Sequence, residues 1–207
     1  MAEVVQTAAG MWRAVNPRES MPWLSSLTVP WWIAGGWALD LFVGVQSRLH
    51  RDLDIGVFRR DVLQVLSALH SWEFFEAKGG ELTRLREGGL PRADVNSLWV
   101  RPAGTTQWTL ELMLDESVGD RWIFRRQPLI QRSLSLAVRH NPEGIPYLAP
   151  EIQLLYKARL VRTQDQIDFN LIAPRLAPEA RAWLREALAA EDPDHKWLSA
   201  LDARSAL

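Results

Sequence analysis

The sequence predicts an α/β (α+β) fold, in which a mixed sheet is followed by a small C-terminal helical lobe. Segments 52–58 and 108–115 alternate apolar and polar residues as strands do, whereas segment 60–71 has the spacing of an amphipathic helix. After a turn-rich stretch, the rest of the chain has helical patterns only. We therefore expect a core over residues 1–145 and a helical lobe over residues 146–207.

The first part of the core is expected to consist of short elements. Apolar residues at helical spacing predict a helix over residues 1–15, and prolines with serines predict a connection over residues 16–29. The apolar run of residues 31–34 is typical of a buried strand. A glycine pair follows that strand and precedes a short helix over residues 37–42.

The later core elements follow from similar patterns. The helix over residues 60–71 is expected to bury one face, formed by Val62, Leu63, Leu66 and Leu69. Two glycine pairs divide residues 72–101 into two or three short strands, and residues 122–124 are expected to add another. In the lobe, we expect three helices, over residues 150–162, 164–175 and 178–190.

Composition restricts the classes of function. The chain has 207 residues, of which 47% are hydrophobic and 24% charged, and this is an ordinary globular composition. The formal net charge of −1 gives no overall field that would attract nucleic acid or a membrane. The absence of cysteine excludes disulfides, cysteine metal sites and thiol catalysis. No signal peptide or membrane span is recognisable, so we expect a cytoplasmic protein without a membrane partner.

Gly35 and Gly36 lie between the predicted strand and the predicted helix. Glycine lets the backbone approach a ligand closely, and the first turn of a helix offers free N–H groups to phosphate. The alternative is a plain tight turn, which is what a glycine pair usually marks.

Asp52 and Asp54 are two residues apart on a predicted strand, so their side chains share one face. Two carboxylates this close repel each other, and a divalent cation removes the conflict. Oxygen ligands suit Mg²⁺ or Mn²⁺, which would share its coordination shell with water or substrate phosphates. The alternative is a solvated strand end.

Glu111 is the acidic residue in the middle of the apolar strand 108–115. A buried carboxylate is costly unless it is paired or binds a metal. The alternative is an open sheet face that exposes Glu111 to water.

The spacing of these features resembles that of a known family. The segments are Trp32-Ile33-Ala34-Gly35-Gly36-Trp37-Ala38-Leu39-Asp40, then Gly44 and Arg48, and then His50-Arg51-Asp52-Leu53-Asp54-Ile55. They resemble aminoglycoside and lincosamide nucleotidyltransferases, which belong to the DNA polymerase β-like superfamily. Segments 150–158 and 165–169 resemble the C-terminal helical part of that group.

The resemblance implies a polymerase β-like nucleotidyltransferase core and assigns roles to the residues that match. Asp52 and Asp54 would carry the metal, and Gly35 with Gly36 would contact the nucleotide's phosphates. A third carboxylate, acting as ligand or general base, would come from a later strand. Glu111 fits this role best, and Asp115 is the runner-up on the same face.

Three cationic or titratable residues complete the expected nucleotide site. Lys157 would reach the triphosphate from the second lobe, and Arg48 with His50 would steady phosphate or substrate from a loop. For each of them, a solvated surface position is the alternative.

The expected activity is metal-dependent transfer of a nucleoside monophosphate, expected to be AMP, from ATP or another nucleoside triphosphate to a hydroxyl group of a small molecule. An aminoglycoside or lincosamide antibiotic would fit. The alternatives are an RNA or protein acceptor, an inactive nucleotide-binding module, and a protein-interaction domain. We do not expect nucleic acid as a partner, because the total charge is near zero.

The expected character of the acceptor depends on the rim of the cleft. Several acidic residues are expected there and would favour a cationic acceptor: Glu81, Glu87, Asp94, Asp115, Glu116 and Asp120. Most of the eleven tryptophans are expected in the core, but one or two would allow a more apolar acceptor to stack.

Overall fold

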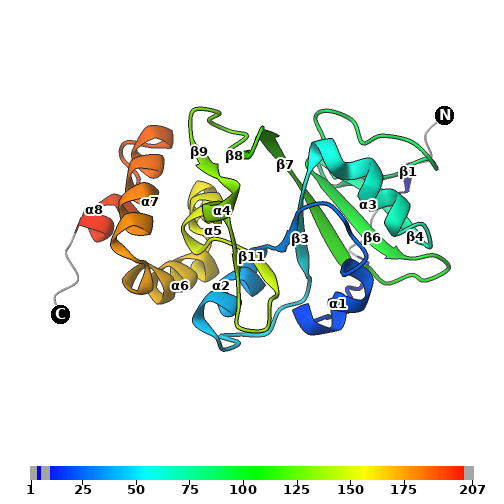
Figure 1. Cartoon of the computed structure of the whole chain (residues 1–207), viewed down its shortest axis with the longest axis horizontal. Helices are drawn as coiled ribbons and strands as arrows, with labels where there is room; N and C mark the ends of the chain where they lie inside the picture. Colours follow the sequence, from blue (N-terminus) through cyan, green and yellow to red (C-terminus); the bar gives the residue numbers. More distant parts are fainter. Residues whose placement is uncertain (1–3, 6–9, 203–207) are drawn as a thin grey trace.

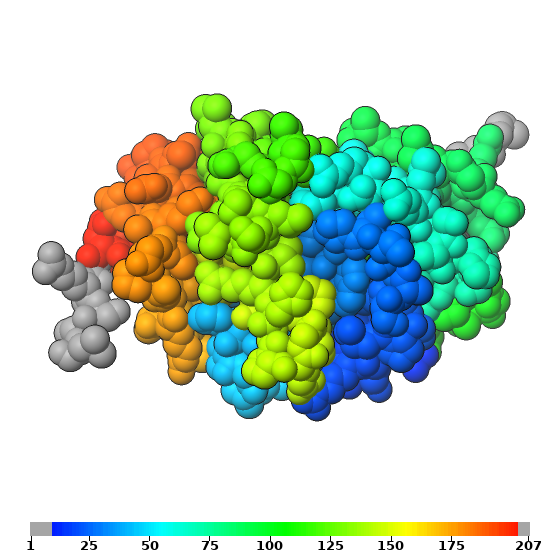
Figure 2. Space-filling model, in the orientation of Figure 1, coloured from blue at the N-terminus to red at the C-terminus, as the bar shows by residue number. Residues whose placement is uncertain are grey.

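A computed structural model describes residues 4–5 and 10–202 of the chain. The molecule is elongated (Figures 1 and 2). The sheet lies toward one end, and the helices of residues 150–202 lie toward the other (Figure 1). No described helix has the combination of length and apolar character that a membrane span needs.

The sheet is mixed, as the sequence predicts, and its described strands run in the order β1-β5-β4-β6-β7-β3-β2-β11-β10. Strand β8 pairs with β7, and β9 pairs with β8. The strands are β1 (Val4–Val5), β2 (Trp31–Ile33), β3 (Asp54–Phe58), β4 (Trp72–Lys78), β5 (Glu81–Arg84), β6 (Ser97–Pro102), β7 (Leu110–Val118), β8 (Arg121–Ile123), β9 (Gln131–Ser133), β10 (Val138–His140) and β11 (Pro146–Leu148). The central strands β3 and β7 are parallel neighbours.

Strand β7 lies between β6 and β3 in the sheet, and its residues alternate between buried and partly exposed. Leu110, Leu112 and Leu114 are fully buried on one face, while Glu111 and Met113 are partly exposed on the other. On β3, Ile55 is fully buried in the same way. The apolar face of each strand therefore fixes which face carries its acidic residues.

The prediction of a helix over residues 1–15 is wrong for those residues of the segment that the structure describes. Residues 4–5 form β1, and Trp12 makes a β-bridge with Trp108. Helix α1 instead spans Pro17–Leu24, inside the predicted connection. Asn16 and Glu19 form a reciprocal capping box, and Pro17 occupies a position where helices tolerate proline, so local capping overrides the proline-rich composition. Residues 1–3 and 6–9 lie outside the described part.

The predicted helix over residues 60–71 is shorter than expected. A 3₁₀ turn, η1 (Arg59–Asp61), precedes α3 (Val62–Ala68). Its buried face includes Val65 in place of Leu63, whose exposed fraction is 49%. Val62, Val65 and Leu69 recur at helical spacing on the buried face, and Leu63 lies beside that face.

The turn-rich stretch before residue 146 is a hairpin. It joins β10 to β11, and β11 then pairs in parallel with β2. The first residues after the turn therefore belong to the sheet, and the helical part begins at Pro150. Near this hairpin, the structure has the short helix α4 (Leu134–Ala137).

The C-terminal helices match the three predicted ones and add a fourth. They are α5 (Pro150–Lys157) with η2 (Ala158–Leu160), α6 (Thr163–Ile172) with η3 (Ala173–Arg175), α7 (Pro178–Glu191) and α8 (Trp197–Asp202).

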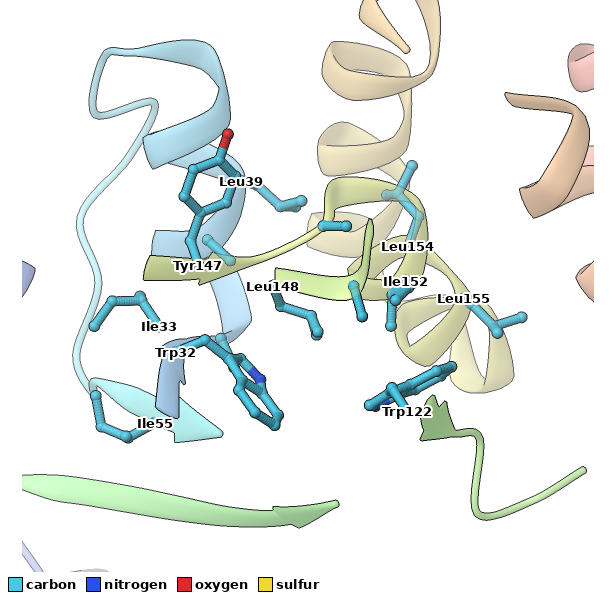
Figure 3. Close-up of a cluster of buried hydrophobic side chains, with 14 of the residues drawn as sticks. Trp32, Ile33, Leu39, Ile55, Trp122, Tyr147, Leu148, Ile152, Leu154 and Leu155 are labelled. Atoms are coloured by element: carbon cyan, nitrogen blue, oxygen red, sulfur yellow. The ribbon is translucent and has the colours of Figure 1, made fainter. Parts of the chain in front are cut away.

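One hydrophobic core joins the sheet to these helices. Trp32 and Ile55 from the sheet, Leu39 from α2 (Gly35–Val43) and Leu154 from α5 belong to the same buried cluster (Figure 3). Several tryptophans are core residues, as expected; Trp32, Trp122 and Trp197 are fully buried. Because α5 packs on α2, the lobe is held close to the turn where α2 begins.

Gly56 provides a test of this packing. It lies directly opposite Trp32 on the neighbouring strand, and a Cβ atom at Gly56 would overlap the indole ring. We expect Gly56→Ala to lower the free energy of unfolding by about 1–3 kcal/mol, measured by urea denaturation.

The control for this prediction is the same change in a Trp32→Phe background. No described residue accepts a hydrogen bond from Trp32 Nε1, so phenylalanine loses no polar contact and makes room for the methyl group. An equal loss from Gly56→Ala in both backgrounds would contradict the packing argument.

Candidate active site

The glycine pair forms a strained turn at the start of α2. Gly35 has φ +64°, a conformation that residues with side chains rarely adopt. A Cβ atom on Gly35 would overlap the carboxylate of Asp54. The backbone N–H of Ala34 also donates to the carbonyl oxygen of Asp54 at 2.8 Å. Glycine is therefore required here, and the turn lies directly against the first acidic residue of β3.

The two aspartates follow the predicted alternation, although the strand is shorter than expected. Strand β3 begins at Asp54, so Asp52 lies just before it. Leu53 between them is fully buried, and its carbonyl oxygen accepts a hydrogen bond from the backbone N–H of Glu111 at 3.0 Å. This bond continues the β3–β7 pairing, so both aspartates keep the face that the alternation gives them.

Glu111 joins the pair because of the strand register. It lies directly opposite Asp54 across the parallel β3–β7 pair. One carboxylate oxygen from each of Asp52, Asp54 and Glu111 lies within 4.8 Å of the others. The structure thus brings together the three carboxylates that the sequence singles out.

Electrostatics make this cluster costly without a cation. Burial raises the pKa of Asp54 well above its usual value, and the charges of Glu111 and Asp52 raise it further. Burial also raises the pKa of Glu111, against hydrogen bonds from Ser97 and Trp99 that lower it. Clustered oxygen ligands that destabilise one another are the donor set that a hard divalent cation prefers, so the residues fit Mg²⁺ or Mn²⁺.

Asp115, the alternative third carboxylate, is not part of this cluster. It is buried, and it accepts hydrogen bonds from Tyr156 Oη at 2.7 Å and from Trp122 Nε1 at 3.1 Å. Burial raises the pKa of Asp115 to about 6, although both hydrogen bonds lower it. Its carboxylate therefore ties β7 to β8 and α5.

His50 and Arg48 pack against Gly36. A Cβ atom on Gly36 would overlap both side chains, so they lie beside the first turn of α2. His50 Nε2 lies 2.6 Å from Asp40 Oδ2, which makes this an internal ion pair when His50 is protonated. Burial acts to raise the pKa of Asp40, but hydrogen bonds from His50 and Ser47 outweigh it and lower that pKa. An ionised Asp40 accepts hydrogen from Nε2, which leaves His50 Nδ1 as the nitrogen near Gly36.

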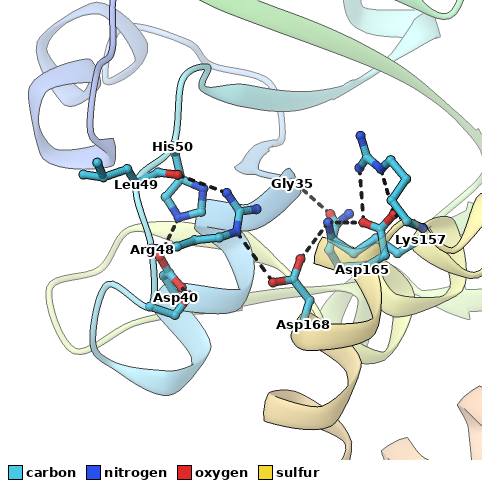
Figure 4. A network of polar contacts seen from close by, with 11 residues as sticks. Gly35, Asp40, Arg48, Leu49, His50, Lys157, Asp165 and Asp168 are labelled. Carbon is cyan, nitrogen blue, oxygen red and sulfur yellow. Dashed lines mark hydrogen bonds and ion pairs between the residues drawn. The ribbon is translucent and has the colours of Figure 1, made fainter.

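Lys157 lines the same cleft, but carboxylates already surround its ammonium group. Lys157 Nζ lies 3.0 Å from Asp165 Oδ1 and 2.9 Å from Asp168 Oδ2, and only 8% of the side chain is exposed (Figure 4). Arg48 Nε approaches Asp168 at 3.7 Å. A phosphate at Lys157 would therefore have to compete with, or join, this network.

The cleft that contains these groups has a volume of about 680 Å³. All eight predicted site residues line it: Gly35, Gly36, Arg48, His50, Asp52, Asp54, Glu111 and Lys157. A larger cavity of about 840 Å³ lies between α3 and the β4–β5 hairpin and contains none of them. We therefore identify the candidate site by the residues that line the cleft and not by its volume.

The expected acidic rim is wrong. None of the six acidic residues assigned to the rim lines the cleft. Glu81, Glu87 and Asp94 belong to β5 or the connection after it, on the side of β7 away from β3, and Asp115 is buried against Trp122 and Tyr156. The lining is rich in cations: Arg48, Arg51, Arg126, Lys157, Arg159 and Arg162.

Several residues of the site are visible only in three dimensions. Gln153 and Tyr156 line the cleft from α5, and Ser97 Oγ donates to Glu111 Oε1 at 2.5 Å from the neighbouring strand. Asp40 alone had a signal in the sequence, because it is a charged residue within the apolar helix that follows the glycine pair.

We expect Lys157→Ala to destabilise the protein. The change leaves Asp165 and Asp168, both buried, without their shared ammonium partner, and breaking a buried ion pair costs about 3 kcal/mol. Urea denaturation measures the loss, and Lys196→Ala, at an exposed lysine without an ion pair in the described structure, is the control. Equal stability of the two variants would contradict the prediction.

Asp115 should make stability depend on pH. A folded-state pKa of about 6, above the unfolded value of 3.8, stabilises the fold at low pH, and this contribution is lost as the pH rises through 6. Asp115→Asn removes the titration. The unfolding free energy of the variant minus that of the wild type should therefore rise by roughly 2 to 3 kcal/mol between about pH 4 and pH 7. A difference that stays constant over this range would refute the assignment.

Comparison with known proteins agrees with this geometry. The aminoglycoside-2''-adenylyltransferase family matches residues 19–86, which include the glycine turn and the aspartate pair. No curated protein sequence is significantly similar to the chain.

Solved structures show the same fold at low sequence identity. A crystal structure of ANT(2")-Ia in complex with adenylyl-2"-tobramycin has a TM-score of 0.55 and 11% identity, over 84% of this chain and 95% of that one. The lincosamide antibiotic adenylyltransferase LnuA, with lincomycin bound, has a TM-score of 0.54 and 18% identity, over 77% of this chain and 97% of that one.

The matching family and LnuA are adenylyltransferases by description, and the ANT(2")-Ia structure contains adenylyl-2"-tobramycin. The carboxylate cluster beside the glycine turn is consistent with that chemistry. The similarity to these structures therefore gives the chain the polymerase β-like nucleotidyltransferase fold, and residues 19–86 resemble the aminoglycoside-2''-adenylyltransferase family.

Proposed function

We propose that this protein transfers AMP from ATP to a hydroxyl group of a small molecule and releases pyrophosphate. The observation that carries the proposal is the convergence of Asp52, Asp54 and Glu111 directly beside the Gly35–Gly36 turn. A phosphate-binding helix start and a carboxylate cluster in one cleft are what phosphoryl-transfer chemistry needs. The proposed setting is the cytoplasm, in keeping with a chain that has no cysteine.

The nucleotide is proposed to lie with its phosphates against the start of α2. Gly35 and Gly36, in the first turn of α2, line this part of the cleft, and Arg48 with His50 flanks Gly36. The choice of ATP is supported by the description of the matching family as adenylyltransferases.

Asp52, Asp54 and Glu111 would hold the divalent cation. When bound, Mg²⁺ or Mn²⁺ supplies neutralising charge for the triphosphate and the transferring group. The cation would also stabilise the ionised carboxylates, because it relieves the mutual repulsion that raises the pKa of Asp54.

Glu111 is also the group that we propose to take the proton from the acceptor hydroxyl. Ser97 donates to Oε1 and so fixes the carboxylate of Glu111 within the cleft. Burial raises the pKa of Glu111, which makes it a better proton acceptor than an exposed carboxylate.

The charge of the cleft bears on the acceptor. With six cationic side chains in its lining and no acidic rim, the cleft offers no surplus negative charge to a polycation. Support for an antibiotic acceptor therefore comes from the neighbours, whose structures contain adenylyl-2"-tobramycin and lincomycin.

An RNA 3′ end is a second candidate acceptor, favoured by the arginines of the same lining. Arg51 and Arg159 are exposed there and make no ion pair within the described structure. Phosphate backbones need such cationic partners.

A mass-shift screen tests the function and separates these acceptors. Hydroxylated compounds, including aminoglycosides and lincosamides, are incubated with the protein, Mg²⁺ and each nucleoside triphosphate, and a parallel reaction uses RNA with radioactive nucleotide. Addition of one nucleoside monophosphate to a small compound supports the proposal. Labelled RNA with every compound unmodified would replace it with the second candidate.

In the assay that shows transfer, we expect Asp52→Asn or Asp54→Asn to lower the rate at least a hundredfold, on the order of what one metal ligand contributes. Stability without metal should stay equal or rise, because a repelling charge is removed. Asp120→Asn, at an exposed position outside the cleft, is the control. Full activity in either site variant would overturn the assignment.

A further inference from the structure

Helix α2 begins without a cap from its own segment. Ala34 occupies the N-cap position and makes no side-chain capping bond. The missing acceptor comes from the C-terminal lobe, where Gln153 of α5 accepts a hydrogen bond from the Gly35 N–H at 2.8 Å through Oε1. One free donor of the helix start is therefore satisfied across the cleft.

This bond fixes the orientation of the Gln153 amide. Because Oε1 faces Gly35, the Nε2 group with its two N–H donors faces elsewhere. Gln153 is only 6% exposed, and it lines the cleft. No described residue accepts a hydrogen bond from Nε2, and Nε2 is not among the fully enclosed polar atoms that lack a partner. The buried side chain thus presents two open donors to the cleft.

The position of these donors is defined by Gly35. Gln153 binds the N–H of this residue, and the carboxylate of Asp54 occupies the space where a Cβ atom of Gly35 would lie. Gln153 therefore lies at the same turn as the carboxylate cluster and the start of α2. Lys157, one helical turn further along α5, is already held by Asp165 and Asp168 (Figure 4).

We propose that Gln153 is a nucleotide-binding residue, and that its Nε2 donates a hydrogen bond to a phosphate oxygen of the nucleoside triphosphate. This inference rests on the proposed function and adds a ligand from the second lobe. Nε2 opens into the cleft, and a phosphate oxygen there can accept from it in a charge-assisted hydrogen bond. A single amide then holds both the glycine turn and the phosphate that lies on it.

The first test is Gln153→Glu. The carboxylate keeps an acceptor for the Gly35 N–H, but it removes both donors and places a negative charge beside the phosphate. We expect a lower urea midpoint without ligand, because the new carboxylate is nearly buried beside Asp54. We expect the dissociation constant for the α,β-methylene analogue of ATP with Mg²⁺ to rise at least about tenfold, measured by calorimetry.

Two further variants separate binding from folding. Gln153→Met has a similar length but neither donor nor acceptor, so it should weaken binding and also lower the urea midpoint. Gln107→Glu adds the same charge at an exposed position outside the cleft and should change neither value. If Gln153→Glu fails to fold, weaker binding by a folded Gln153→Met variant supports the proposal, and unchanged binding overturns it.

Adenosine identifies the part of the nucleotide that Gln153 contacts. The affinity lost in Gln153→Glu should be large for the ATP analogue and small for adenosine. An equal loss for both ligands, or no loss for either, overturns the phosphate contact but leaves the proposed function intact. A wild-type protein that binds no nucleotide would overturn the proposed function together with this inference.

Discussion

The structure depends on one constraint, which is that three carboxylates must be held together against their own repulsion. Asp52, Asp54 and Glu111 cannot share a site in an apolar protein interior without a strong framework. The framework is the parallel β3–β7 pair, whose fully buried leucine and isoleucine side chains anchor the opposite face. The apolar burial on one face offsets the electrostatic cost on the other, and a cation would relieve that cost directly.

The C-terminal lobe contributes polar contacts to the site as well as one side of the cleft. Lys157, Asp165 and Asp168 form a buried charge network that reaches Arg48 before β3, and Gln153 caps the helix that follows the glycine turn. These contacts cross from α5 and α6 to the segment that carries the predicted motif. The position of the lobe and the geometry of the Gly35–Gly36 turn therefore depend on each other.

The sequence predicted the features whose causes are local. Alternation placed Asp54 and Glu111 on the polar faces of their strands, and the glycine pair predicted the turn. It did not predict α1, because a capping box beginning at Asn16 outweighs two prolines. The prediction of an acidic rim was wrong for another reason. The order of the strands in the sheet determines whether a residue such as Glu81 lies near the cleft, and local sequence patterns do not reveal that order. Gln153 was missed because its partner, Gly35, is 118 residues away.

The order of the strands also explains how Asp54 on β3 and Glu111 on β7 meet although a long segment separates them in the sequence. Parallel strands cannot be joined by a tight turn, so β3 and β7 need a crossover connection. The chain between them forms η1, α3 and the strands β4, β5 and β6, which add to the far side of β7. The pairing of Asp54 with Glu111 therefore depends on the register of β3 and β7 and not on their separation in the sequence. The crossover also reaches the site from β6, where Ser97 and Trp99 both donate hydrogen bonds to Glu111.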